Sequence, residues 1–210
     1  MKPEILQPHI EEFIKNLSIY NIPINYDNLD IRDKEQAMDP VVGKFLNFVL
    51  NIKEPSIVLE IGCGVGVSTK YLISISSIKR YIAIDANKRR LDICKNTIKN
   101  KNIEFYNANG INYLKTTKLS FDAIIIDSVK SDYSLMWHLA KKKIERGGLI
   151  IFDDVLLYGL ISQNKSIIPR RYLNMCEQLI ELIREVSCDS NYGFSIIPVG
   201  GGVLLARNVS

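Results

Sequence analysis

Three aspartates follow two short apolar runs in the sequence. Asp127 comes directly after FDAIII (121–126), and Asp153 and Asp154 come directly after LIIF (149–152). Such runs are typical of buried parallel strands, whose carboxyl ends meet at one edge of a sheet. Carboxylates that converge there repel one another unless a cation or protons compensate them, and oxygen ligands suit a hard divalent cation such as Mg²⁺. The three aspartates therefore predict a metal site; the alternative is that they only cap helices and turns.

A lysine lies close to the first of these acids. Lys130 follows Asp127 by three residues, so we expect it to point into the same site. As a general base it would need a pKa lowered by burial or by a cation; otherwise its charge would stabilise an anion. Tyr133 begins the next predicted helix and is a further candidate, either for the substrate pocket or for the core.

A glycine-rich turn follows the first predicted strand, in the stretch VLEIGCGVGVST (58–69). Its glycines stand at alternate positions, and glycine lets the backbone turn sharply and lets a ligand approach the main chain. A carboxylate inside the strand end is costly unless a ligand or donor meets it. The stretch predicts a nucleotide-type ligand site, with a tight structural turn as the alternative. Its candidate binding residues are Glu60, Gly62, Gly64, Gly66 and Ser68.

Two later strand ends extend this ligand site. Asp85 and Ala86 follow the second predicted strand (81–84), where an acid can accept hydrogen bonds from both ribose hydroxyls of an adenosyl ligand. Asn109 and Gly110 follow the third, where a loop would pass the adenine ring. The spacing G-x-G-x-G differs from the dinucleotide fingerprint, because Val67 occupies the place of its third glycine. An NAD-dependent oxidoreductase is therefore disfavoured.

Strands and helices alternate along the chain. The pattern predicts an α/β fold with a doubly wound, Rossmann-like sheet of seven strands, mostly parallel and closed by an antiparallel C-terminal hairpin. We expect one domain, 1–210, made of an N-terminal helical segment (1–52) and a core (53–210). An amphipathic first helix (3–19) would cover the sheet or serve a homodimer interface, and the stretch 21–33 reads as loose. The other predicted helices begin at Asp39-Pro40 and cover 67–76, 87–99, 133–145 and 169–186.

Composition limits the class of protein. Of the 210 residues, 47% are hydrophobic and 24% charged, which is typical of a globular chain. No apolar run is long enough to span a membrane, and the N-terminus lacks the apolar core of a signal peptide. The four cysteines form no C-x-x-C pair, which argues against zinc or a disulfide framework and favours the cytoplasm. A net charge of +4 permits a polyanionic partner without demanding one.

The motifs LEIGCGVGVS, IAIDAN, D-x-x-K and FDDVLLYG together resemble those of divalent-metal-dependent O-methyltransferases, the family of the catechol and caffeoyl-CoA enzymes. The resemblance implies S-adenosylmethionine (SAM) as cofactor, a divalent cation such as Mg²⁺, and a lysine base. Carried over, the ligands become Asp127, Asp153 and Asp154, and the base becomes Lys130. The family has asparagine at position 154 and many methyltransferases have aspartate at position 109, so both sites are altered here.

A narrower resemblance points to the acceptor. The segments 155–175 and 195–208 are similar to bacterial tRNA 5-hydroxyuridine methyltransferases, which methylate a modified wobble uridine. The resemblance implies tRNA as partner, with Arg170 and Arg171 contacting its phosphates; the other basic runs (79–80, 88–90 and 141–143) read as solvated surface. The alternative substrate is a small catechol-like phenol, and a non-catalytic binding domain is disfavoured by Asp127 and Lys130.

Overall fold

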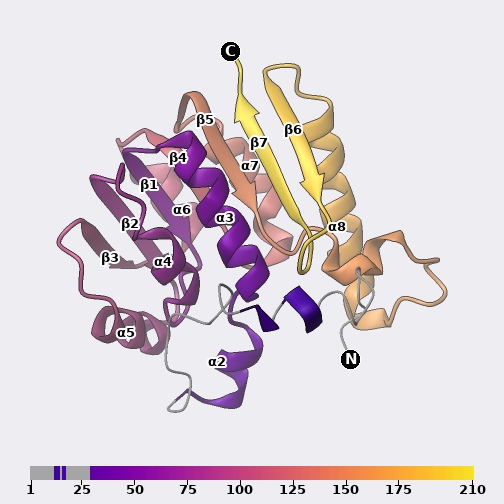
Figure 1. Ribbon diagram of the computed structural model, residues 1–210. Coiled ribbons are helices and arrows are strands. Elements are labelled where there is room, and N and C mark those ends of the chain that lie inside the picture. The colour runs from indigo at the N-terminus through magenta and orange to yellow at the C-terminus, as the bar shows by residue number, and fades with distance from the viewer. Residues whose placement is uncertain (1–11, 15, 18–28) are drawn as a thin grey trace.

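A seven-stranded sheet forms the centre of the protein in a computed structural model that describes residues 12–14, 16–17 and 29–210 (Figure 1). The strand order is β3-β2-β1-β4-β5-β7-β6. The first five strands pair in parallel, and β7 runs antiparallel to both β5 and β6. This confirms the predicted fold. The strands are β1 (Ile57–Ile61), β2 (Arg80–Asp85), β3 (Ile103–Asn107), β4 (Phe121–Ile126), β5 (Ile144–Phe152), β6 (Tyr192–Ile197) and β7 (Val203–Asn208).

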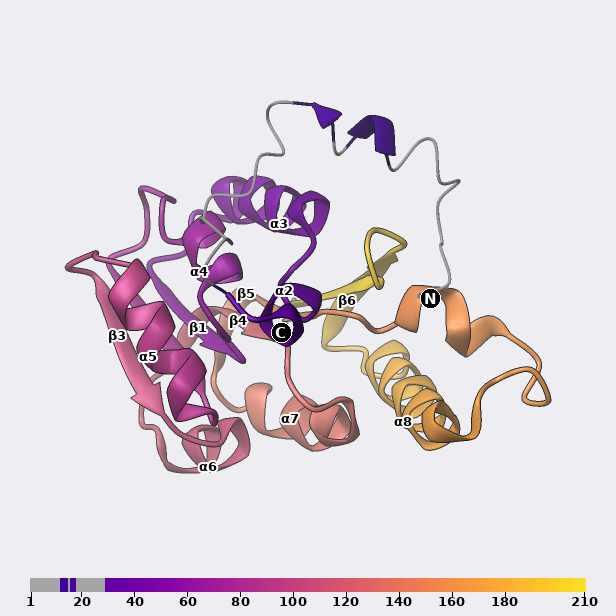
Figure 2. The same ribbon diagram turned by 90° about the horizontal axis from the view of Figure 1, so that it is seen from below.

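Helices cover both faces of the sheet (Figure 2). One face packs against α3 (Pro40–Lys53), α4 (Val67–Leu72) and α5 (Lys88–Thr97), and the other against α6 (Gly110–Thr116), α7 (Tyr133–Ala140) and α8 (Arg170–Ser187). Successive strand residues alternate between the two cores: in β1, Val58 faces the first and Leu59 the second. The short α2 (Ile31–Glu35) and the 3₁₀ helices η2 (Lys130–Asp132) and η3 (Leu157–Ser162) lie in the connections.

The predicted start of α3 is confirmed. The carboxylate of Asp39 accepts a hydrogen bond from the backbone N–H of Val41 at 2.8 Å, and Pro40 occupies the first helical position. Proline fits there because its missing N–H would have no intrahelical partner. None of the helices in the described part of the chain is long and apolar enough to cross a membrane.

Several predicted boundaries are wrong. The fifth strand starts at Ile144 rather than at Leu149, and α7 ends at Ala140 rather than at Glu145. Gly147 and Gly148 lie inside the strand, where the pairing with β4 shifts register. The helix α4 ends at Leu72, and α2, α6 and η3 were not predicted. Most of the predicted helix 3–19 lies outside the described residues.

Candidate active site

The glycine turn after β1 lies against the end of β4. Gly62, Gly64 and Gly66 have φ angles of 94°, 53° and 96°, in the left-handed region that favours glycine. At Gly62 the two segments are so close that a Cβ would overlap the carbonyl oxygen of Asp127 and lie 2.7 Å from its carbonyl carbon. The backbone N–H of Asp127 also donates to the carbonyl of Ile61 at 2.9 Å. The turn therefore fixes the position of Asp127.

Glu60 is held by the protein itself. Its side chain lies in the core, with the residue 1% exposed. The hydroxyl of Ser68 donates to Oε1, while those of Thr69 and Tyr81 donate to Oε2 at 2.5 and 2.9 Å. Burial raises the pKa of Glu60, and the three hydroxyls oppose that shift. The carboxylate thus joins β1 to α4 and β2, and the predicted contact of Glu60 with the cofactor stays a prediction.

Glu60→Ala is expected to destabilise the protein by about 3 kcal/mol or more, because three buried hydroxyls lose their acceptor. Glu60→Gln keeps the shape and one oxygen acceptor, so its unfolding free energy at neutral pH should stay close to that of the wild type. Because the folded-state pKa of Glu60 is raised, the native state binds more protons, and the associated stability is lost as pH rises above about 4.5. Urea unfolding across pH should show a flatter profile for Glu60→Gln; equal stability of both variants would contradict this role.

Asp85 lies beside the glycine turn, at the end of β2. Its Oδ2 accepts the backbone N–H of Gly64 at 2.8 Å, and its Oδ1 accepts that of Asn87 at 2.7 Å. The exposed Ala86 follows, and its carbonyl accepts from Nδ2 of Asn107 at 3.1 Å. The carboxylate therefore helps to order the turn, and its contact with ribose hydroxyls stays a prediction.

Asn109 and Gly110 begin α6 rather than a loop. The Oδ1 atom of Asn109 accepts the backbone N–H of Asn112 at 3.2 Å and caps the helix. Gly110 is buried, and a Cβ there would overlap the side chain of Ile61. The structure thus gives both residues a role in placing α6 against β1, and the predicted adenine contact remains untested.

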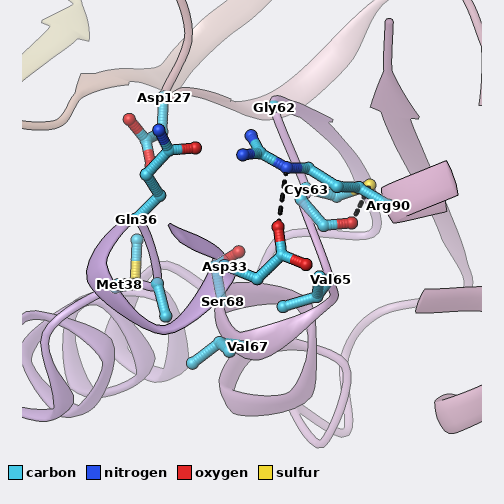
Figure 3. Close-up of a pocket in the computed structure, with 12 residues that line it drawn as sticks. Asp33, Gln36, Met38, Gly62, Cys63, Val65, Val67, Ser68, Arg90 and Asp127 are labelled. Atoms are coloured by element: carbon cyan, nitrogen blue, oxygen red, sulfur yellow. Dashed lines mark hydrogen bonds and ion pairs between the residues drawn. The ribbon is translucent and has the colours of Figure 1, made fainter. Parts of the chain in front are cut away.

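A small cavity lies between the glycine turn and the segment that contains α2 (Figure 3). Its volume is about 30 Å³, which is room for about one water molecule and far less than a ligand pocket of several hundred Å³. The space enclosed here is therefore too small for a whole nucleoside. The predicted residues that line the cavity are Gly62, Gly64, Ser68 and Asp127, and the structure adds Asp33, Gln36 and Arg90.

Ion pairs hold α2 against α5. The carboxylate of Asp33, which is 2% exposed, accepts from Nε of Arg90 at 2.9 Å and from a terminal nitrogen of Arg89 at 2.6 Å. Arg89 also pairs with Asp30 at 2.9 Å, and Asp30 caps α2 through the backbone N–H of Asp33. The two arginines are therefore not merely solvated surface. The sequence signal for α2 was an N-cap acid three residues before a second acid.

Lys130 joins the acids at the ends of β4 and β5. Its Nζ donates to Oδ1 of Asp127 at 2.9 Å, to the hydroxyl of Tyr133 at 2.7 Å and to the carbonyl of Asp153 at 3.3 Å. It lies 3.7 Å from Oδ2 of Asp154, and its side chain is 11% exposed. The structure therefore places Lys130 at the strand ends, as predicted.

The charge of Lys130 follows from these neighbours. Burial by itself would lower the pKa of Lys130, but Asp127, Tyr133, Asp154 and Asp153 raise it well above the ordinary value of a lysine. The acids around Lys130 thus favour its charged form in this arrangement. The geometry is compatible with the alternative role, stabilising an anion, and the role of general base stays a prediction.

Tyr133 supports this cluster from within the core. The residue is fully buried, its hydroxyl lies 3.0 Å from the carbonyl oxygen of Asp153, and its ring packs at 5.0 Å on that of Phe152. With no exposed surface, Tyr133 cannot touch a substrate in this conformation. Its predicted alternative, a place in the core, is the one observed.

The predicted metal ligands do not fit a divalent cation here. No group of three acids, histidines or cysteines in the described part of the chain could hold a metal ion. Asp153 is 4% exposed, its Oδ1 accepts the backbone N–H of Asp154 at 2.8 Å, and burial raises its pKa well above the usual range. The ammonium of Lys130 lies between Asp127 and Asp154 and offsets part of their negative charge.

Known proteins share both the sequence pattern and the fold. Caffeoyl-CoA O-methyltransferases of Petroselinum crispum and Citrus natsudaidai are 26% and 25% identical; the alignments cover 80% of this chain in both cases and 75% and 78% of the relatives. The SAH-bound methyltransferase PaMTH1 of Podospora anserina superposes with a TM-score of 0.82 at 17% identity, covering 95% of this chain and 94% of that one. The O-methyltransferase of Bacillus cereus in complex with SAH gives 0.76 at 21%, covering 95% and 97%. The O-methyltransferase family model matches residues 30–209, and the chain belongs to this family.

Proposed function

We propose that the protein transfers a methyl group from SAM to a hydroxyl oxygen. The observation that carries this proposal is the place of Asp127: it lines the cavity of the glycine turn and also bonds Lys130 at 2.9 Å. A donor in the turn and an acceptor at the ammonium would thus meet at one residue. Relatives of the same family that bind SAH or act on caffeoyl-CoA support the choice of donor and reaction.

The residues of the chain would act mainly by binding and alignment. SAM, when bound, supplies the methyl group on a sulfonium centre. The backbone of the glycine turn and Asp85 hold the donor, and the Lys130 ammonium attracts the acceptor oxygen in its anionic form. Bringing the two reactants into line removes much of the entropic barrier. The α2 segment, closed over the cavity by Asp33, excludes water from the donor.

A divalent cation remains part of the proposal as an untested prediction. Mg²⁺ bound by Asp127, Asp153 and Asp154 would require Lys130 to leave its place between two of these carboxylates. Removing divalent ions with EDTA and then adding Mg²⁺ tests this directly. Loss and recovery of methyl transfer would support the cation, and unchanged turnover in EDTA would contradict it.

The proposed acceptor is 5-hydroxyuridine at the wobble position of tRNA. What supports it is the pair Arg170 and Arg171, which are exposed in the first turn of α8 and form no salt bridge with a described residue. Cations are unfavourable at a helix N-terminus, so an anionic partner would stabilise them. The first turn of α8 lies at the same end of the sheet as the strand ends with the acids (Figure 1). Mass spectrometry of tRNA nucleosides from cells lacking this protein tests the acceptor: unchanged methylation of 5-hydroxyuridine would overturn it.

Arg170→Ala combined with Arg171→Ala is expected to lower kcat/KM for tRNA by about 10- to 100-fold and to reduce the salt slope of binding by about one per lost phosphate contact. Affinity for SAH should stay unchanged, since neither residue lines the cavity. Arg184→Ala is the matched control, because this arginine is 71% exposed in the last turn of the same helix. Equal tRNA kinetics in all variants would contradict the assigned contact.

A small phenol is the second candidate acceptor, and the caffeoyl-CoA enzymes among the relatives favour it. Parallel assays with catechol, caffeoyl-CoA and a tRNA anticodon stem-loop separate the two. Turnover of the phenols without any response to tRNA would select the second candidate. A steep fall of activity with salt on the stem-loop would select the first. The homodimer and the cytoplasmic location likewise stay predictions.

A further inference from the structure

The turn between β6 and β7 reaches into the acid cluster. It packs against the segment that follows β5 through two backbone hydrogen bonds. The N–H of Val155 donates to the carbonyl of Gly202, and the N–H of Leu156 donates to that of Gly201, both at 2.9 Å. The residues directly after Asp154 are thus tied to a hairpin that follows them by more than forty positions in the chain.

Gly201 has no room for a side chain. A Cβ there would overlap Oδ1 of Asp154 and lie 2.7 Å from its Cγ and 3.1 Å from its Cα. The backbone does not explain this glycine, because Gly200 and Gly202 have φ angles of 57° and 92° but Gly201 lies outside the left-handed region. A positive φ is therefore no obstacle to an alanine at position 201. What an alanine would not fit is the carboxylate of Asp154.

The second oxygen of the Asp154 carboxylate also has a close neighbour, Lys130. This oxygen, Oδ2, lies 3.7 Å from Nζ of Lys130. The backbone of Asp154 is in the left-handed region, with a φ of 59°, which aspartate tolerates better than most residues. The side chain therefore lies between the ammonium on one side and the bare Cα of Gly201 on the other.

We propose that Gly201 is a positioning residue of the active site, which holds the Asp154 carboxylate against Lys130 by leaving the space that this carboxylate fills. This inference depends on the proposed function in one respect: it takes the cluster of Lys130 and Asp154 as the part of the site that binds the methyl acceptor, called the acceptor side. A methyl group at position 201 pushes the carboxylate away from its place and loosens the segment after β5. The donor side, built by the glycine turn and α2, includes neither residue.

A double-mutant cycle on stability tests the contact without any assay of activity. Gly201→Ala is expected to lower Tm by several degrees in the wild-type background, which is the size of shift that one steric clash causes in a domain of this length. Asp154→Gly removes the carboxylate and keeps a residue that tolerates a positive φ. In that background, Gly201→Ala should lower Tm by less than half of the loss seen in the wild-type background. Asp154→Asn keeps the size of the side chain, so the full loss should persist there. Equal losses in all three backgrounds, or a double variant Gly201→Ala with Asp154→Gly that fails to fold, would overturn the proposal.

The matched control is Gly193→Ala in β6 of the same hairpin, where a Cβ would meet only Cγ1 of Val209 at 3.9 Å. It should leave Tm and turnover unchanged.

Gly201→Ala should reduce kcat/KM for the acceptor about tenfold while the affinity for SAH stays within twofold. A crystal structure of Gly201→Ala should show the Asp154 carboxylate displaced; finding it in place would refute the inference. If the wild type transfers no methyl group to any acceptor, the proposed function fails, but the stability cycle still decides the contact.

Discussion

Asp127→Ala is expected to lower methyl transfer by about a thousandfold or more. Asp127 is the residue shared by the two halves of the site: it lines the donor cavity and it is the nearest acid to the ammonium of Lys130, at 2.9 Å. Without it, Lys130 is held only by Tyr133 and the β5 end, and an acceptor oxygen loses its alignment with the donor. Losses of this size are typical when a preorganised electrostatic group is removed from an active site. Steady-state kinetics with SAM and the chosen acceptor measure the effect.

Asp132→Ala is the matched control. It removes the same charge five residues away, and the Asp132 side chain caps no helix. This variant should retain wild-type turnover and Tm. Asp127→Ala should also fold, since the backbone hydrogen bond of residue 127 to Ile61 does not involve the side chain. Turnover within tenfold of the wild type in Asp127→Ala would remove Asp127 from the mechanism.

Gly62→Ala is expected to have the second large effect, on the fold and on the donor site together. A Cβ at this position meets backbone rather than a flexible side chain, and the φ of 94° is one that alanine rarely adopts. Either the glycine turn or the end of β4 must move. We expect a loss of about 3 kcal/mol or more in unfolding free energy and no measurable SAH binding by calorimetry.

The control for the backbone part of this effect is Gly147→Ala. Gly147 has a φ of 71°, but a Cβ there would meet only the end of the Arg207 side chain at 3.8 Å. Its expected cost is about 1 kcal/mol, from the left-handed backbone alone. The difference between the two variants then measures the collision with Asp127. Equal unfolding free energies of the two would show that the turn and β4 are not in contact.

The sequence predicted those parts that depend on neighbouring residues. The run FDAIII became β4 with the predicted ends, and Asp39 caps α3 as expected. The prediction from the sequence pattern failed at glycines, because a glycine is compatible both with a turn and with a position inside a strand or at a helix start. A glycine pair such as Gly147-Gly148 is typical of a turn, but β5 continues through it because Phe121 pairs with Ile144 across an irregularity. Gly110 was assigned to a loop, yet it opens α6 because only glycine packs so close to Ile61.

Within the site, the sequence identified which residues meet but not always what each does. That Lys130 lies with Asp127 followed from their spacing. The raised pKa of Lys130 did not, because it depends on how many acids surround a buried group. Nor could the position of α2 against α5 be predicted, since it depends on Asp33 pairing with Arg90, 57 positions away. Long-range partners of this kind leave no local periodicity in a sequence.

The hairpin of β6 and β7 comes after every other described element in the chain, and β7 is inserted between β5 and β6 rather than added at the rim. During synthesis on a ribosome, the earlier strands and helices emerge while β5 still has an open side and the N–H groups of Val155 and Leu156 lack the carbonyls of Gly202 and Gly201. The acceptor side of the site therefore cannot be assembled until residues 201–208 have left the exit tunnel. A nascent chain would acquire its donor half first, and the complete reaction centre only as β7 is placed.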